Sequence, residues 1–239
     1  MKLEEVKEDL GQGISLEMVL IPAGKFVMGS PESEEGRSPE ETQHEVTLTE
    51  PYYMGKYAVT QEQWESVMGN NPSFTKGAKF PITGVSEVDC WEFIEKLHAR
   101  KNGWRNRRLG EFRLPTEAEW EYACRAGTTT AYSFRDKMTP KDANYKGSNL
   151  DKSVEVGSYR PNAFGLYDMH GNIWEWCEDG YGVYPTGAVI DPKGPSTADE
   201  CVLRGGSFDH DQLSARSSAR NRNSNAAYNC FGFRLARTP

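Results

Sequence analysis

Short apolar runs separated by turn residues dominate the first part of the chain. Residues 14–21 end in four consecutive apolar positions, and Pro22-Ala23-Gly24 closes the run. Residues 25–29 look like a second strand, so the pattern predicts a hairpin. Strand-like alternation resumes at residues 45–48 and continues through the tyrosine-rich stretch 51–59, after an acidic, proline-containing loop. The beginning of the chain is therefore expected to be mainly β-structure.

Three later stretches carry apolar residues at helical spacing: residues 60–69, 86–103 and 116–127. Capping boxes mark two of the starts, with Thr60 followed by Gln63 and Thr116 followed by Glu119. Each pattern ends at a glycine, as helices commonly do. We expect the aromatic residues on these faces to pack in the core.

Regular periodicity fades after residue 127, and the chain to residue 200 is rich in turn residues. A long irregular region inside a compact domain usually carries function or metal-supported loops. The sequence shows no internal repeat and no evident linker. We therefore expect one α+β domain, spanning residues 1–239, with little regular secondary structure and many ordered loops.

The C-terminal stretch contains an aperiodic insert between two distinctive segments. Arg204-Gly205-Gly206-Ser207 precedes it, and Gly232-Phe233-Arg234-Leu235-Ala236 follows it with strand-like alternation. The insert, residues 208–231, contains no Lys, Glu, Met or Trp, although the rest of the chain uses all four. The insert is thus either a functional site or a plain loop.

Charge and composition exclude some broad functions. The formal net charge of −7 argues against a protein that coats nucleic acid. Arg105, Arg107 and Arg108 could contact phosphate, but in an acidic chain they fit a solvated turn better. No apolar run is long enough to cross a bilayer, and the first residues show no signal-peptide core. We expect a soluble protein, cytoplasmic or at the cell surface if a leader is removed.

The sequence patterns supply no catalytic machinery. The five cysteines show no CxxC spacing, and we expect small buried residues in a reducing compartment, with a Cys177–Cys201 bridge left open. The four histidines are far apart, and no nucleophile elbow, phosphate loop or dinucleotide fingerprint is present. His170 is accordingly treated as a lone histidine beside a glycine.

The densest stretch before the insert is Asp168-Met169-His170-Gly171-Asn172-Ile173-Trp174-Glu175-Trp176. Asp168 and Glu175 offer hard oxygen ligands, and Gly171 permits a turn that aims carbonyls inward. Such a set suits calcium rather than zinc. The alternative is that Asn172 and Glu175 only hydrogen-bond loop backbone while the tryptophans pack.

Taken together, several stretches resemble the sulfatase-modifying, formylglycine-generating enzyme family. They are Met18 to Gly24 with Phe26-Val27-Met28-Gly29, Val59-Thr60-Gln61-Glu62-Gln63-Trp64, Arg113 to Ala123, Asn172 to Trp176, and both segments around the insert. The resemblance runs in consistent order from Ile14 to Ala236. It implies a C-type-lectin-like α+β fold, often stabilised by calcium.

The same resemblance indicates where the family's catalytic residues would lie and implies that this chain lacks them. Family enzymes carry two cysteines after the Gly-Gly-Ser, which hold copper and oxidise a substrate cysteine. Aligned on Gly205-Gly206-Ser207, those places are occupied by His210 and Ala215. Without a thiolate that chemistry cannot proceed. The expectation is a pseudoenzyme without copper; the alternative is a formylglycine-generating oxidoreductase acting on protein cysteine.

The insert resembles the C-terminal variable region of diversity-generating retroelement variable proteins, framed here by residues 204–236. Adenine mutagenesis of Asn codons never reaches Lys, Glu, Gln, Met or Trp, and only Gln212 departs from that rule. Arg216, Arg220 and Arg222 could be scaffold that holds loop backbone. The residues expected to form one exposed ligand-binding patch are Asp209, His210, Asp211, Leu213, Ser214, Ser218, Asn221, Asn223, Ser224, Tyr228, Cys230 and Phe231.

The resemblance also implies a calcium site and a kind of partner. Asp168 and Glu175 match the family's carboxylate ligands, Gly171 and Ile173 its carbonyl ligands, and Asn144-Tyr145 the start of a second site. The partner would be a protein or surface ligand, with no nucleic acid and no transmembrane segment. A third alternative is an interaction domain of the same family that is not diversified.

Overall fold

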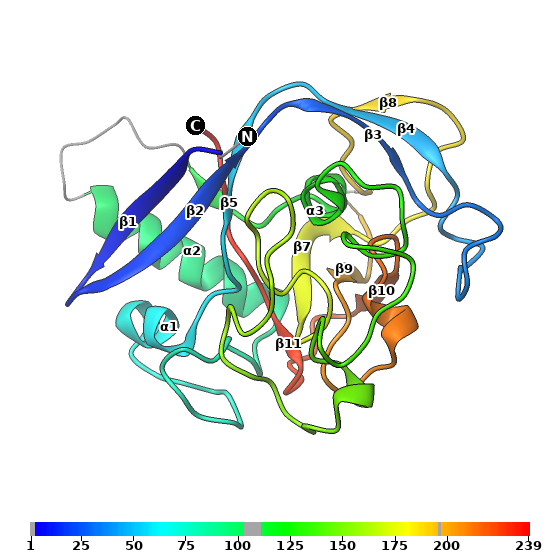
Figure 1. Cartoon of the computed structure of the whole chain (residues 1–239). Coiled ribbons are helices and arrows are strands. Elements are labelled where there is room, and N and C mark those ends of the chain that lie inside the picture. The colour runs from blue at the N-terminus through cyan, green and yellow to red at the C-terminus, as the bar shows by residue number, and fades with distance from the viewer. Residues whose placement is uncertain (1–2, 103–110, 196) are drawn as a thin grey trace.

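The described part of the chain forms three small sheets and three α-helices (Figure 1). The computed structural model describes residues 3–102, 111–195 and 197–239. The arginine cluster at residues 105–108 lies outside the described residues. No helix in the described part is long and apolar enough to cross a membrane.

The first sheet joins the two ends of the described chain. Its antiparallel order is β1-β2-β5-β12-β6, formed by β1 (Glu5–Gly11), β2 (Ile14–Ile21), β5 (Tyr52–Gly55), β12 (Ala236–Arg237) and β6 (Phe112–Arg113). The short strand β12 is hydrogen-bonded on both sides, so the end of the Gly-Phe-Arg segment is fixed within this sheet. Figure 1 shows β5 and the red C-terminal segment side by side.

The predicted hairpin of residues 14–21 with 25–29 is wrong in its pairing. Both strands exist, but β3 (Gly24–Met28) pairs with β4 (His44–Leu48) in a second sheet, order β3-β4-β8, completed by β8 (Val189–Ile190). Both edges of β2 are already taken by β1 and β5. The turn after β2 therefore carries the chain from one sheet to the next.

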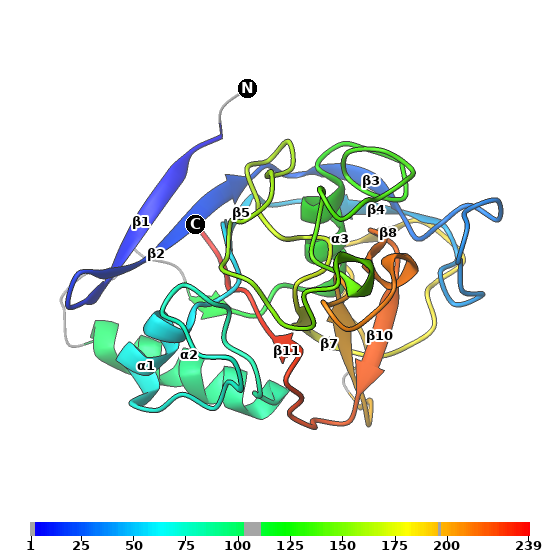
Figure 2. The ribbon, with the colours of Figure 1, turned by 60° about the horizontal axis from the view of Figure 1, so that its bottom comes forward.

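The third sheet carries much of the C-terminal insert. Its order is β10-β9-β7-β11, formed by β10 (Arg220–Asn223), β9 (Cys201–Arg204), β7 (Trp174–Gly180) and β11 (Phe231–Gly232). β10 is antiparallel to β9, and β11 runs parallel to β7. The loop between β10 and β11 runs along the lower edge of Figure 2.

The three predicted helices are present as α1 (Gln61–Met68), α2 (Glu87–Asn102) and α3 (Glu117–Arg125). Both capping boxes form as expected. α1 and α2 pack on each other through the stacked rings of Trp64 and Phe93, whose centroids lie 5.4 Å apart. Phe233 meets Phe93 edge-on at 5.5 Å, which ties the Gly-Phe-Arg segment to this core.

The insert is more regular than its sequence indicates. Besides β10 it contains a 3₁₀ helix, η2 (Gln212–Ala215), and another, η1 (Lys146–Ser148), precedes it in the irregular region. β10 has the sequence Arg-Asn-Arg-Asn, which offers no apolar alternation. Its strand conformation comes from the ladder with β9, not from local preference.

Candidate functional site

Arg204, at the end of β9, holds the backbone of the insert. Its side chain is completely buried and donates to the carbonyls of Ser218 (2.9 Å), Ala219 (2.6 Å) and Ser217 (2.9 Å). It also pairs with the buried carboxylate of Glu121 on α3. One guanidinium therefore satisfies three consecutive carbonyls, as its planar fork of donors allows.

Arg216 fixes the insert to the acidic loop of residues 30–43. Its guanidinium donates to both carboxylate oxygens of Glu41 (2.8 Å each), to Glu34 (2.5 Å) and to the carbonyl of Gly36 (2.7 Å). Burial favours the neutral form of Glu41, but hydrogen bonds from Arg216 and Ser30 prevail and lower its pKa below the ordinary value. The η2 turn and the acidic loop thus form one connected unit.

Arg220 and Arg222 behave differently from each other. Arg220 makes a two-pronged ion pair with Glu117 (2.6 and 2.8 Å) and lies 3.8 Å above the ring of Tyr184. Arg222 is half exposed and pairs with Glu200 at 3.2 Å. Arg216 and Arg220 therefore serve as scaffold, whereas Arg222 lies at the surface.

Nine of the twelve candidate ligand-binding residues have solvent exposure. Four are exposed: Asp209, Asp211, Ser224 and Tyr228. Five are partly buried: His210, Leu213, Ser214, Asn221 and Asn223. The remaining three, Ser218, Cys230 and Phe231, are buried. The prediction that all twelve face solvent is wrong for these three.

Packing explains each of the three buried positions. The hydroxyl of Ser218 donates to Glu34 (2.8 Å) and accepts from Arg216 (2.9 Å), so it belongs to the buried ion-pair network. Cys230 and Phe231 join the main apolar core, where the ring of Phe231 meets Trp176 edge-on at 5.5 Å. Cys230 and Phe231 therefore anchor the end of the insert in the core and are not available to a ligand.

The nine accessible residues fall into two groups against different elements. In the first, 209–214, the carbonyl of His210 accepts from Lys146 in η1, and Leu213 packs near Gly36 of the acidic loop. In the second, 221–228, Asn225 caps the start of α2 through Val88, and β10 lies along β9. We call these groups the η2 face and the β10 face.

A pocket of about 590 Å³ lies beside the η2 face. Its walls come from the acidic loop, from residues 129–138 and from η2, and they include Glu34, Glu35, Tyr132, Asp136, Lys137 and Leu213. Sequence reasoning missed it, because the first two segments are about a hundred positions apart and neither carries a motif. Only the acidity of residues 30–44 hinted at chemistry there.

His170 supports this pocket from behind. Its Nδ1 lies 2.8 Å from the carbonyl of Ala215, and its Nε2 lies 3.0 Å from the backbone nitrogen of Ser133. It therefore donates to η2 and accepts from the loop of residues 129–138. Cys124 Sγ lies 3.7 Å from His170 Nε2, but burial raises the pKa of that thiol to about 12. The pair is a structural link, since no thiolate forms near neutral pH.

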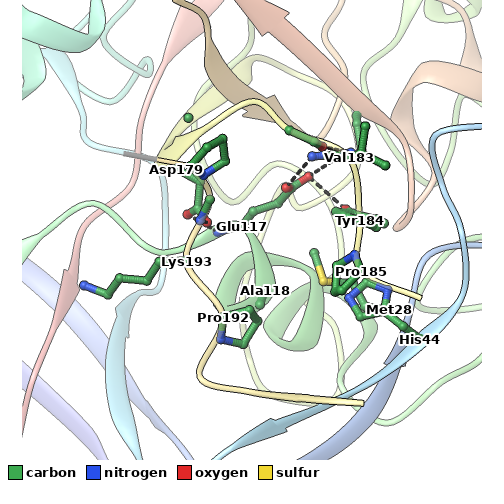
Figure 3. A pocket seen from close by; sticks show the side chains of 15 residues that line it. Met28, His44, Glu117, Ala118, Asp179, Val183, Tyr184, Pro185, Pro192 and Lys193 are labelled. Carbon is green, nitrogen blue, oxygen red and sulfur yellow. Dashed lines mark hydrogen bonds and ion pairs between the residues drawn. The ribbon is translucent and has the colours of Figure 1, made fainter. Parts of the chain in front are cut away.

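A smaller hollow of about 100 Å³ lies at the start of α3 (Figure 3). Glu117 points into it and accepts from Arg220 and from the hydroxyl of Tyr184 (2.9 Å). Beside it, Asp179 accepts from the backbone nitrogens of Glu117 (2.7 Å) and Gly194 (2.6 Å). Burial, together with the neighbouring Glu117 charge, raises the pKa of Asp179 to about 7. These groups anchor β10 to α3.

Asp179 predicts a loss of stability with rising pH. A carboxyl with pKa near 3.9 when unfolded and about 7 when folded holds its proton more tightly in the folded state. Its contribution is complete below about pH 4 and is lost as the pH rises through about 7, on the order of 2–4 kcal/mol. We expect urea denaturation of the wild type to show this decline between about pH 4 and 7, and Asp179→Asn to flatten it. Asp199→Asn, an exposed change nearby, is the control; an equal flattening there would contradict the assignment.

The candidate calcium residues fit a hard cation only in part. Asp168 is partly buried and its Oδ2 accepts from Gly157 (2.7 Å), while its buried Oδ1 has no hydrogen-bond partner within the described residues. Burial raises its pKa to about 6. Both oxygens of Glu175 instead accept from Arg234 (2.6 and 2.7 Å), and Trp120 donates to one of them. Asp168 thus offers a free ligand oxygen, whereas Glu175 is engaged.

The two carbonyl positions and the second site are equally mixed. The carbonyl of Gly171 accepts from the nitrogen of Ile173 at 3.0 Å. The side-chain oxygen of Asn144 is buried without a hydrogen-bond partner in the described chain, and Tyr145 is buried in a small apolar cluster. Across residues 3–102, 111–195 and 197–239, no three His, Cys, Asp or Glu side chains converge as a metal cluster. Calcium therefore stays a prediction.

Of the two positions that hold cysteines in the resembled enzymes, His210 lies on the η2 face and Ala215 lies at the buried end of η2. His210 Nδ1 is 2.7 Å from the hydroxyl of Ser207 and 3.3 Å from Trp174 Nε1, and Ala215 is buried. The sequence has no cysteine between Cys201 and Cys230. Cys177 and Cys201 are free thiols, so the bridge left open above is not formed.

Comparison with known proteins identifies the family. A family model described as "Sulfatase-modifying factor enzyme 1-like domain" matches residues 4–239. The chain belongs to this family. It is 28% identical over 276 residues to the formylglycine-generating enzyme of Streptomyces coelicolor, which covers 91% of this chain and 88% of that protein.

One further relative in sequence and one solved structure extend the comparison. The chain is 32% identical over 268 residues to serine/threonine-protein kinase pkn1 of Chlamydia caviae, covering 98% of this chain but only 40% of that protein. The chain thus spans about two fifths of that relative. The solved structure of Treponema denticola variable protein 1 superposes with a TM-score of 0.89 at 29% identity, covering 98% of this chain and 99% of that chain. The predicted formylglycine-generating-enzyme-like, C-type-lectin-like fold, mixed α and β with few helices, is confirmed.

Proposed function

We propose that this protein is a non-catalytic ligand-binding protein of the diversity-generating retroelement type, with residues 204–236 as its variable region. The observation that carries the proposal is that the insert exposes many of its side chains while buried arginines hold its backbone in place. Arg204 holds three consecutive carbonyls of the insert and Arg216 ties the insert to the acidic loop, while the residues of the η2 and β10 faces have solvent exposure. The likeness to a variable protein over nearly the whole chain supports it.

The chemistry of the accessible residues agrees with recognition. The η2 and β10 faces present Asp, Asn, Ser and His together with Tyr228, which is 52% exposed. An aromatic anchor gives contact area at low entropic cost, and small polar groups adapt their hydrogen bonds. A rigid scaffold keeps the ordering cost of binding low. The partner would be a protein or a surface ligand.

The competing function is oxidation of protein cysteine by the formylglycine-generating chemistry. Relatives with that name support it. Against it stand His210 and Ala215 at the aligned cysteine positions, and the lack of any cysteine between Cys201 and Cys230. We propose that the protein is not an enzyme and takes no copper, and that structural calcium binds at Asp168 together with Gly171, Ile173 and Glu175. The unpartnered Oδ1 of Asp168 supports that metal.

A display library tests the binding function. The nine accessible candidate positions would be randomised with codons that begin from Asn, while Ser218, Cys230 and Phe231 stay fixed. We expect most clones to keep the wild-type melting temperature within a few degrees, because surface changes cost about 0.5 kcal/mol or less. Selection against a panel of unrelated proteins is expected to yield specific binders. Yeast-surface display with thermal challenge measures both.

The matched control randomises three buried positions of the same segment, Ser217, Ser218 and Ala219. That library is expected to lose folded display almost entirely, since each position lies in the Arg204 and Arg216 network. Equal tolerance in the two libraries, or turnover of a cysteine peptide by the copper-loaded protein, would overturn the proposal. A near-copy of the coding segment beside a reverse-transcriptase gene would separate a diversified protein from a fixed interaction domain.

A further inference from the structure

The pocket beside the η2 face is lined by both apolar and acidic side chains. Leu213 and Met138 supply aliphatic surface, and the buried ring of Tyr132 forms part of the floor. The phenol donates to the carbonyl of Gln212 (2.8 Å), so the floor is fixed to η2. A volume of about 590 Å³ is within the range of pockets that bind small molecules or peptide side chains.

The charges around the pocket do not cancel. Arg216 is paired with both Glu34 and Glu41, so this group of three side chains carries a net charge of about −1. Among the described residues, Glu35 and Asp136 enter no ion pair, and both line the pocket. Burial raises the pKa of Tyr132, and the charges of Glu34, Asp211 and Glu35 raise it further against the opposing charge of Arg216. Lys137 is the one lining cation without an ion pair in the described chain.

From this geometry we infer that the pocket is a specificity pocket for an arginine or lysine side chain of a protein ligand. The aliphatic stem lies along Leu213 and Met138, and the cationic head meets the carboxylates of Glu35 and Asp136. Leu213 belongs to the η2 face and also lines the pocket, so a ligand seated on that face reaches the pocket with one side chain. This inference rests on the proposed function and gives that binding surface a chemical preference.

Most of this pocket lies outside the variable region. Glu35 belongs to the acidic loop and Asp136 to the segment 129–138, whereas Gln212, Leu213 and Arg216 are the lining residues that come from the insert. Diversification of residues 209–214 would therefore change the part of the pocket formed by η2, while Glu35 and Asp136 stay the same. A population of variants would share a preference for basic surfaces and differ in their finer specificity.

Titration with capped amino acids tests the pocket directly. N-acetyl-arginine amide would be added to the full ¹⁵N-labelled chain, with N-acetyl-glutamate amide and N-acetyl-norleucine amide as comparisons. We expect saturable shifts of the amides of Leu213 and Asp136 with arginine only, at a Kd on the order of millimolar for so small a probe. Affinity is expected to fall as salt is raised from about 50 to 300 mM.

Three charge variants make the test specific. Glu35→Gln is expected to weaken arginine binding about tenfold, and Lys137→Gln is expected to strengthen it, because each changes the charge at the head group. Glu32→Gln, an exposed acid of the same loop that does not line the pocket, is expected to match the wild type. Equal shifts with all three probes, or no effect of Glu35→Gln, would overturn the inference.

The outcomes separate this inference from the proposed function. If library selection yields binders that ignore Glu35→Gln, the binding function stands and the acidic pocket is not part of it. If capped arginine binds at Leu213 but selection yields no binders, the arginine pocket is supported and the proposed function as a diversified binding protein is contradicted.

Discussion

Replacing Arg204 by alanine is expected to destabilise the protein by about 3–5 kcal/mol and to disorder the insert. The change removes four donors at once, which leaves the carbonyls of Ser217, Ser218 and Ala219 buried without that partner. It also leaves Glu121, fully buried on α3, paired only with Arg125 among the described residues. Urea denaturation gives the free energy of unfolding, and hydrogen exchange at residues 217–219 reports on the loop.

Arg222→Ala supplies the matched comparison. It removes an arginine from the neighbouring strand β10, but this side chain is half exposed and its ion pair with Glu200 is at the surface. The cost is expected to stay within about 0.5–1 kcal/mol. Arg204→Lys, which keeps the charge and loses the fork, is expected to lie between the two. If Arg204→Ala costs no more than Arg222→Ala, the insert is not held from within, and the basis of the proposed display is lost.

Sequence reasoning was most successful where local chemistry decides the structure. The capping boxes at Thr60 and Thr116 located the starts of α1 and α3, because a side chain and a backbone nitrogen three positions apart suffice to form them. The alternating pattern after the insert predicts a half-buried strand: Phe233 and Leu235 do lie in the core, but residues 233–235 form no strand and Arg234 is buried as well. The family could be inferred because many short stretches agree in order.

Features that depend on distant partners escaped prediction. β10 is a strand only because β9 lies beside it, and β3 pairs with β4 because both edges of β2 are occupied. Ser218 has the composition of a recognition residue, yet Arg216 and Glu34 bury it. The acidic pocket joins segments that no local pattern connects. In each case long-range packing overrides the local signal.

Gly171→Ala is expected to cost about 3 kcal/mol or more, through two separate effects. The backbone at Gly171 has φ of 84°, a region that L-residues rarely adopt. A methyl group there would also lie 2.3 Å from the carbonyl oxygen of Asn144, which is backbone and already accepts from Asn172. The turn cannot move away easily, since the nitrogen of Gly171 donates to Gly205 at 2.7 Å. Melting temperature and urea denaturation measure the loss.

Gly165→Ala separates the clash from the backbone strain. Its φ is 82°, nearly the same, but a methyl group there meets no atom of the described residues within 4 Å. We expect it to cost only the conformational strain, about 1–2 kcal/mol. The difference between the two variants therefore measures how tightly the turn 168–172 is held between Asn144 and the Gly-Gly segment. The melting temperatures of the wild type and Gly171→Ala would also be measured in calcium and in EDTA. If calcium binds at Asp168, we expect calcium to stabilise the wild type more than Gly171→Ala. Equal losses in the two variants would show that the turn is free to shift, and a turn that shifts cannot pre-form either the calcium site or the support of the insert.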